Sequence, residues 1–250
     1  MVTANILGMC GSLAGKKNMD RQVCQPNGKL KTPAHLQQLR QVSSWLALIL
    51  LCGISTARAE PWTLWRTTNN VTVQYRQDNQ HRFNVRAETE LTTSLAAFVA
   101  MLQDTEHASD WISQVKSVTL LQHDSDQEDV VKTRFKGTLL VHERWAVTRS
   151  ILSQDSHQVL TLSIHNRYDP QASETGIQIR YLQARWTLTP LANGKVQIRY
   201  QGSIDPDGMI PGWLVRQHGL QVVLETFIHL RQQIKLPRYQ HAHLPFITEP

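Results

Sequence analysis

The sequence predicts an α+β fold in which one curved antiparallel sheet wraps around a long C-terminal helix. Three observations predict it. The hydrophobic period changes early from two residues to about 3.6, a run of strand-like segments joined by short turns follows, and a long helical pattern comes last. Short links favour antiparallel neighbours, because a parallel pair of strands needs a long crossover.

Two alternating segments open the predicted domain. Residues 71–77 (VTVQYRQ) and 82–91 (RFNVRAETEL) alternate between apolar and polar side chains. In the second segment Phe83, Val85 and Ala87 share one face. The polar link DNQH between the two segments predicts a hairpin.

The period then becomes helical. Apolar side chains recur at helical spacing from Leu95 to Leu102, and either Thr93 or Ser94 is suited to be the N-cap. A short second helix is expected to hold Trp111 and Ile112. These two helices separate the first hairpin from the rest of the sheet.

Six further segments are predicted as strands of an antiparallel meander. Turn-forming sequences such as HDSDQED, YDPQASET and LANGK separate them. The six segments are Val118–His123, Val130–Val141, Trp145–Leu152, Val159–Asn166, Gly176–Thr189 and Lys195–Ile204.

The last pattern is a helix with Pro211 as its first residue, running to about Lys235 and stopped by Pro237. Roughly 25 helical residues span about 38 Å, which is enough to cross a whole sheet. One apolar face is formed by Trp213, Leu220, Val223, Phe227, Leu230 and Ile234. That face predicts packing into the concave side of the sheet.

Residues 1–59 are interpreted as a leader. They hold seven basic residues and one acidic residue, so the whole net charge of +6 lies in them. The run WLALILLCGI is too short for a bilayer span, which needs about 20 residues, and ARA follows it. This pattern predicts a secretory signal cleaved after Ala59, and hence a periplasmic or secreted protein. An uncleaved anchor or a buried helix is the alternative.

Residues 60–250 are predicted to be a single domain with a core over 62–236 and a solvated tail over 237–250. Their charges balance, so nucleic acid is not an expected partner. All three cysteines lie in the leader, which excludes a thiolate nucleophile and a cysteine-ligated metal from the domain. No cofactor or metal is expected, although His241–His243 (HAH) has the makings of a weak metal site. The domain is expected to be a monomer.

Three segments carry a resemblance to a known family. They are VHERWAVTRS (141–150), RYLQARWTLTPLANGKVQIRY (180–200) and SIDPDGMIPGWL (203–214). In this order they resemble exported bacterial START domains, members of a lipid-transfer family with the helix-grip fold, over residues 62–236. One departure is that Trp145 follows Arg144, where the family usually has an acid.

The resemblance implies that the loop before the last helix borders a cavity entrance. Met209, Ile210 and Trp213 would then form an apolar rim that contacts a membrane transiently or an entering acyl chain. The alternative is a hydrophobic staple, which only sets the angle at which the chain enters the helix.

Strand and helix parity on this fold gives candidate ligand-binding residues. The apolar ones are Leu162, Leu182, Ala184, Trp186, Ile198, Leu220, Val223 and Phe227. Arg144, Thr148 and Ser150, with Tyr200, are expected to form a polar end at which the guanidinium binds a lipid head group. The alternatives are a filled core and a structural ion pair of Arg144 with Glu88, Glu90 or Glu143.

These observations favour non-catalytic binding of a lipid or another hydrophobic small molecule, for transfer or sensing. One alternative is a polyketide cyclase-like enzyme that uses His165, Tyr200 or Glu88 in the same cavity. Another is an interaction domain without a cavity. The volume between helix and sheet tests the last alternative, because ligand pockets begin at roughly 300 Å³.

Overall fold

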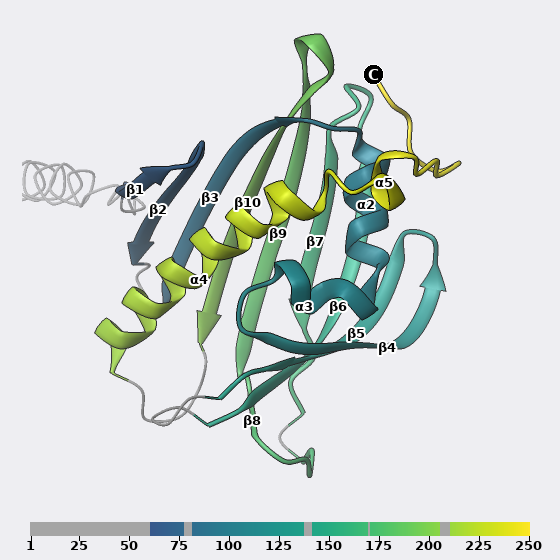
Figure 1. The fold of residues 1–250 in the computed structure, drawn as a ribbon. Coiled ribbons are helices and arrows are strands. Elements are labelled where there is room, and N and C mark those ends of the chain that lie inside the picture. Colours follow the sequence, from purple (N-terminus) through teal and green to yellow (C-terminus); the bar gives the residue numbers. More distant parts are fainter. Residues whose placement is uncertain (1–60, 78–81, 138–141, 170, 206–210) are drawn as a thin grey trace, which may run out of the picture. The chain divides into compact units, whose positions relative to one another are not determined.

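A computed structural model gives the arrangement of the helices and strands after the predicted leader (Figure 1). The predicted leader, its cleavage after Ala59 and the rim residues Met209 and Ile210 lie outside the described part. Within that part, every helix is too short or too polar to cross a lipid bilayer. The described residues are 61–77, 82–137, 142–169, 171–205 and 211–250.

The curved antiparallel sheet is confirmed. Its order is β1-β2-β3-β10-β9-β7-β6-β5-β4, and only the short β8, which pairs with β6, is parallel to its neighbour among the described strands. The strands are β1 (Thr63–Thr68), β2 (Val71–Gln77), β3 (Phe83–Thr92), β4 (Val115–Ser125), β5 (Glu128–Phe135), β6 (Arg144–Gln154), β7 (Leu160–Asn166), β8 (Ile177–Gln178), β9 (Tyr181–Leu191) and β10 (Lys195–Asp205).

Two strands were not predicted from the sequence. Strand β1 lies at the sheet edge, is largely exposed and has an irregular register between Leu64 and Arg66, so it shows no clean alternation. The segment predicted as one strand from Gly176 to Thr189 is broken into β8 and β9. Strand β8 pairs with the start of β6 instead, with Ile177 opposite Arg144.

Helices follow β3 as expected. They are α2 (Leu95–Gln103), the 3-10 turn η1 (Thr105–His107) and α3 (Ala108–Trp111). Ser94 is the N-cap of α2, and its Oγ accepts a hydrogen bond of 3.0 Å from Ala97 N. A capping residue and an apolar run therefore placed this helix correctly.

The long helix α4 (Gly212–Gln233) crosses the sheet diagonally (Figure 1). It begins one residue after Pro211, which is the N-cap, and ends two residues before the expected Lys235. Its buried apolar side chains Leu220, Leu224, Phe227 and Leu230 belong to the main core, and Thr226 is buried beside them.

Residues 237–250 are not the solvated tail that the sequence suggested. They form α5 (Pro237–Gln240) and an extended segment that packs on the domain, and together these are called the C-terminal strap. Tyr239 is buried, and Leu244, Phe246 and Ile247 pack against the core. Thr248 exchanges two backbone hydrogen bonds with the side chain of Gln154. The strap has no helical or alternating period, so only its contacts reveal that it is structured.

Candidate functional site

A cavity of about 780 Å³ lies between the concave face of the sheet and the helices. Its walls come from α2, η1, α3, α4, the C-terminal strap and strands β3 to β7, β9 and β10. Most of the lining is apolar. The volume falls within the range of small-molecule pockets and far exceeds their lower limit of roughly 300 Å³.

Most of the candidate ligand-binding residues that the structure describes line this cavity. They are Thr148, Ser150, Leu162, Leu182, Ala184, Trp186, Tyr200, Val223 and Phe227. They meet there because each has the parity that faces the concave side of its strand or the sheet side of α4.

Four other candidates are placed elsewhere. Ile198 and Leu220 share the correct faces, but they are buried in the packed core beyond the cavity. Trp213 is 61% exposed on the first turn of α4. Arg144 is buried without being part of the cavity wall.

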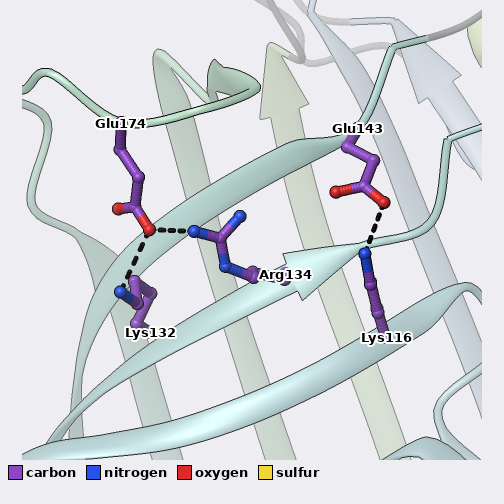
Figure 2. Close-up of polar contacts among 5 residues, drawn as sticks. All are labelled: Lys116, Lys132, Arg134, Glu143 and Glu174. Carbon is purple, nitrogen blue, oxygen red and sulfur yellow. Dashed lines mark hydrogen bonds and ion pairs between the residues drawn. The ribbon is translucent and has the colours of Figure 1, made fainter.

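Arg144 therefore lacks the position expected of a head-group ligand. Its Nη1 donates a hydrogen bond of 2.9 Å to the carbonyl oxygen of His142. Two of its expected acidic partners are engaged by other cations. Arg199 Nε lies 3.1 Å from Glu88 Oε2. Lys116 Nζ lies 2.6 Å from Glu143 Oε1, and Figure 2 draws this pair.

Trp145, the departure from the family pattern, is buried on the opposite face of the sheet from the cavity. The backbone of the β8 segment covers it, with Ile179 N donating to Trp145 O at 2.9 Å. Gly176, at φ 97°, fits there because a Cβ would lie 2.9 Å from the Glu143 carbonyl oxygen. Trp145 is thus buried outside the main core, at the position where the resemblance implied an acid.

The loop over Trp145 is held by an ion pair in which one carboxylate meets two cations. Glu174 Oε1 accepts from Lys132 Nζ at 3.1 Å and also from Arg134 (Figure 2). Both cations project from β5 on the convex face, away from the cavity. This face is charged, whereas the concave face is apolar.

An aromatic cluster forms the cavity floor around Trp186. Its ring is stacked on Phe227 at 5.5 Å between centroids, with 16° between the planes. Tyr200, Phe98 and Trp111 surround it at 4.7, 5.4 and 6.2 Å. These rings supply a large rigid apolar surface.

Small residues leave open space beside this cluster. In the register of the sheet Gly202 lies opposite Ala184, Ala184 opposite Ile164, and Ile164 opposite Ser150. Tyr200 lies back over Gly202, where a Cβ would be only 2.4 Å from the tyrosine hydroxyl. Glycine at 202 is therefore required for this tyrosine orientation.

The polar groups of the wall are mostly neutral. Thr133 on β5 joins Thr148 and Ser150 of β6 at the cavity surface. Burial raises the pKa of Tyr200 to about 12, so its hydroxyl is neutral at any physiological pH. The sequence reasoning missed Thr133 and Trp111 as lining residues. Thr133 shares its strand face with Val131 and Phe135, and this spacing could have predicted that it lines the cavity.

One end of the wall carries the cavity's charged groups among the described residues. Here the β4–β5 hairpin, with His123, Asp126 and Asp129, lies at the cavity together with Leu244 and Phe246 of the strap. His123 Nδ1 lies 2.7 Å from Asp129 Oδ1, and this hydrogen bond raises the pKa of His123. The hairpin therefore places acidic groups at one end of the apolar space.

The residues proposed for acid–base chemistry are not brought together. His165 is exposed and Glu88 pairs with Arg199 on the convex face, so only Tyr200 reaches the cavity. Across the described residues there is no group of three or more potential metal ligands, and His241–His243 is no exception.

With this geometry established, comparison with known proteins identifies the family. The START domain family model matches residues 54–238, about three quarters of the chain. The protein belongs to the START domain family. An uncharacterized protein of Pseudomonas aeruginosa is 26% identical over 189 residues, covering 74% of this chain and 93% of that protein.

Solved structures share the START fold. A STAR-related lipid transfer protein fragment from Xanthomonas axonopodis has a TM-score of 0.65 and 23% identity, covering 71% of this chain and 100% of that chain. Human STARD10 has a TM-score of 0.63 and 16% identity, with 86% of each chain covered. Human StAR-related lipid transfer protein 5 has a TM-score of 0.60 and 14% identity, covering 81% of this chain and 97% of that one. At these identities the likeness establishes the fold.

Proposed function

We propose that this START domain binds a lipid or another hydrophobic small molecule, without covalent chemistry, in the cavity under α4. The observation that carries the proposal is an apolar space of about 780 Å³ within an otherwise packed domain. Burial of apolar surface contributes about 25 cal/mol per Å², before the costs of association. The names of two structural neighbours, which are lipid transfer proteins, support the same class of ligand.

The cavity also argues against the interaction-domain alternative. An empty apolar space destabilises a fold, because the side chains around it lose packing partners. A ligand that fills the space would offset that loss. A domain that served only as a surface for partners would gain nothing from a cavity of this size.

We propose that the ligand enters near the N-terminal end of α4, where the domain contacts a membrane transiently. Trp213 supports this proposal, since a large apolar side chain that is 61% exposed fits the interface of a bilayer. Gly219, in the N-terminal half of α4, lines the cavity, and so does Phe83 of β3. Transfer of the ligand between membranes is consistent with such a contact.

Export to the periplasm or the medium remains part of the proposal. It rests on the apolar run followed by ARA at residues 57–59. N-terminal sequencing of protein made in its native host tests it, and a mature chain that begins at Glu60 is the expected result.

Native mass spectrometry of the full protein, followed by extraction of bound molecules, tests the binding function. We expect one hydrophobic molecule per chain. In parallel, the neutral dye Nile red should bind the wild type, and Ala184→Leu should weaken this binding by filling the cavity. Ala172→Leu, on an exposed loop, is the matched control. A protein that carries no ligand and binds no Nile red would refute the proposed function.

A further inference from the structure

The charge of the cavity wall restricts its ligand. Among the described residues that line the cavity none is lysine or arginine. The ionisable side chains of the described wall, apart from Tyr200, are His123, Asp126 and Asp129, all on the β4–β5 hairpin. The described wall therefore has no lysine or arginine to receive a carboxylate or phosphate. Its one basic side chain, His123, is already hydrogen-bonded to Asp129, so this end of the wall is acidic on balance.

Three hydroxyl groups on adjacent strands form a neutral polar strip, defined as Thr133, Thr148 and Ser150. Thr148 pairs with Val131 of β5, and the other two hydroxyls lie within two residues of that pair along their strands. Within the described part of the chain none of the three side chains makes a hydrogen bond. Their donors and acceptors face the cavity, where they can form hydrogen bonds with a bound molecule.

One further neutral group reaches the same space. Tyr200 lines the cavity, and its hydroxyl makes no hydrogen bond with any described residue. Polar groups in a protein interior are normally paired, so hydroxyls on a cavity wall without a partner in the described chain are suited to hydrogen-bond a polar group of a bound molecule.

The physical balance favours an uncharged group at this strip. An ionised carboxylate or phosphate that enters an apolar cavity loses its hydration. No lysine or arginine on the described wall compensates the loss, and His123 is already paired with Asp129. A hydroxyl or carbonyl loses much less and regains it through hydrogen bonds to the strip. The strip also supplies both donors and acceptors, because each hydroxyl does both.

We propose that the natural ligand is an uncharged amphiphile, whose hydroxyl or carbonyl group hydrogen-bonds to the strip of Thr133, Thr148 and Ser150. The cavity would accordingly discriminate against lipids that must bury a free carboxylate or phosphate. This inference rests on the proposed function, namely that the cavity binds a hydrophobic molecule.

A pair of probes with the same chain length tests the inference. Hexadecan-1-ol and hexadecanoate are used to displace Nile red from the full protein at pH 8, where the acid is ionised. We expect the alcohol to compete at least about tenfold more tightly, which corresponds to the cost of an unpaired buried charge after partial relaxation. Nile red binding alone reports the proposed function.

The outcomes separate the two ideas. Tighter competition by the alcohol supports the inference. Equal or tighter competition by hexadecanoate overturns it and leaves the binding function standing, as does Nile red binding that neither probe reduces. No Nile red binding at all overturns both.

Variants then locate the contact. The double variant Thr148→Val with Ser150→Ala removes two hydroxyls at nearly constant shape, and it should weaken the alcohol by about three- to tenfold for the hydrogen bonds lost. Nile red binding should be unchanged, which shows that the cavity is intact. Thr187→Val, on the convex side of β9, is the control. An unchanged affinity for the alcohol in the double variant would exclude the strip as its binding group.

Discussion

The two ends of α4 are held in different ways, and the difference bears on how a ligand could enter. At its C-terminal end, Leu230 and the following Ile234 are fully buried. Arg231 Nη1 there donates to Thr89 Oγ1 at 2.5 Å and to the Glu90 carbonyl oxygen at 2.8 Å. The C-terminal strap packs directly beyond this end (Figure 1).

The N-terminal end of α4 has few such restraints. Among the described residues no side chain caps it, Trp213 is exposed, and Arg216 lies 5.9 Å from the ring of Tyr75. Segments with few buried contacts open at lower free energy than packed ones. The C-terminal end of α4 is therefore the more firmly anchored end, and its N-terminal end is the less restrained one.

Truncation of the C-terminal strap should reduce the difference between the two ends of α4, and we expect its effect on the free energy of unfolding to be the largest. Deletion of residues 241–250 takes away Leu244, Phe246 and Ile247, which pack against the core, and Glu249, which caps α2. We expect the free energy of unfolding to fall by about 3–5 kcal/mol, from roughly 1 kcal/mol per partly buried side chain and the lost caps. Urea unfolding measures it. An unchanged midpoint would show that the strap is not part of the stable fold.

A single change within the strap should have a smaller effect. Leu95 N and Ala96 N donate to the Glu249 carboxylate at 3.0 and 2.7 Å, where the α2 dipole also favours a negative charge. Glu249→Gln keeps one acceptor and removes the charge, so we expect a loss of about 0.5–1 kcal/mol in urea unfolding. Glu106→Gln, at an exposed site, is the control. If both variants lose the same amount, the cap has no special role.

Acid should weaken the strap end through Asp104. Burial by itself raises the pKa of Asp104, but hydrogen bonds from His107 and Tyr239 outweigh this, and the pKa is lowered from its ordinary value of 3.8. A carboxyl with a lowered pKa stabilises the fold above its unfolded pKa, and this contribution is lost as the pH falls below about 4. The urea midpoint of the wild type should therefore fall more between pH 6 and pH 3 than that of Asp104→Asn. Equal slopes would contradict the assignment.

The exposed end should be the least sensitive in stability. Trp213→Ala removes a side chain with little packing, so the free energy of unfolding should change by less than about 0.5 kcal/mol. Sedimentation with phospholipid vesicles should nevertheless show weaker binding, if this end contacts membranes. A large loss of stability would mean that Trp213 packs as a staple after all.

The faces of strands and helices were predictable from the sequence. Leu182, Ala184 and Trp186 alternate, and the pleat of a strand sends alternate side chains to one side, so their common wall followed directly. The same parity put Ile198 and Leu220 on the correct faces but not in the cavity. Periodicity assigns a face, and it does not say whether another side chain fills the space in front of it.

The predicted polar end of the cavity shows a second limit of prediction from the sequence. Arg144 was the natural candidate because a buried cation needs a partner, yet the wall itself is formed by residues further along β6, from Ala146 to Leu152. Thr133 and Trp111 were not predicted to line the cavity, since neither residue type by itself indicates a binding site. Whether a hydroxyl or an indole N–H has a partner depends on distances between strands and helices that are far apart in the sequence.

The order of elements, their faces and the family pattern could be predicted from the sequence, because propensity, capping and hydrophobic period are local properties. Three features could be seen only in the folded chain: the strap packs at one end of the domain, Arg144 lies outside the wall, and a cavity of about 780 Å³ stays open. These features arise from packing between distant segments. A void is a balance of side-chain volumes across the whole core, and no stretch of sequence contains it.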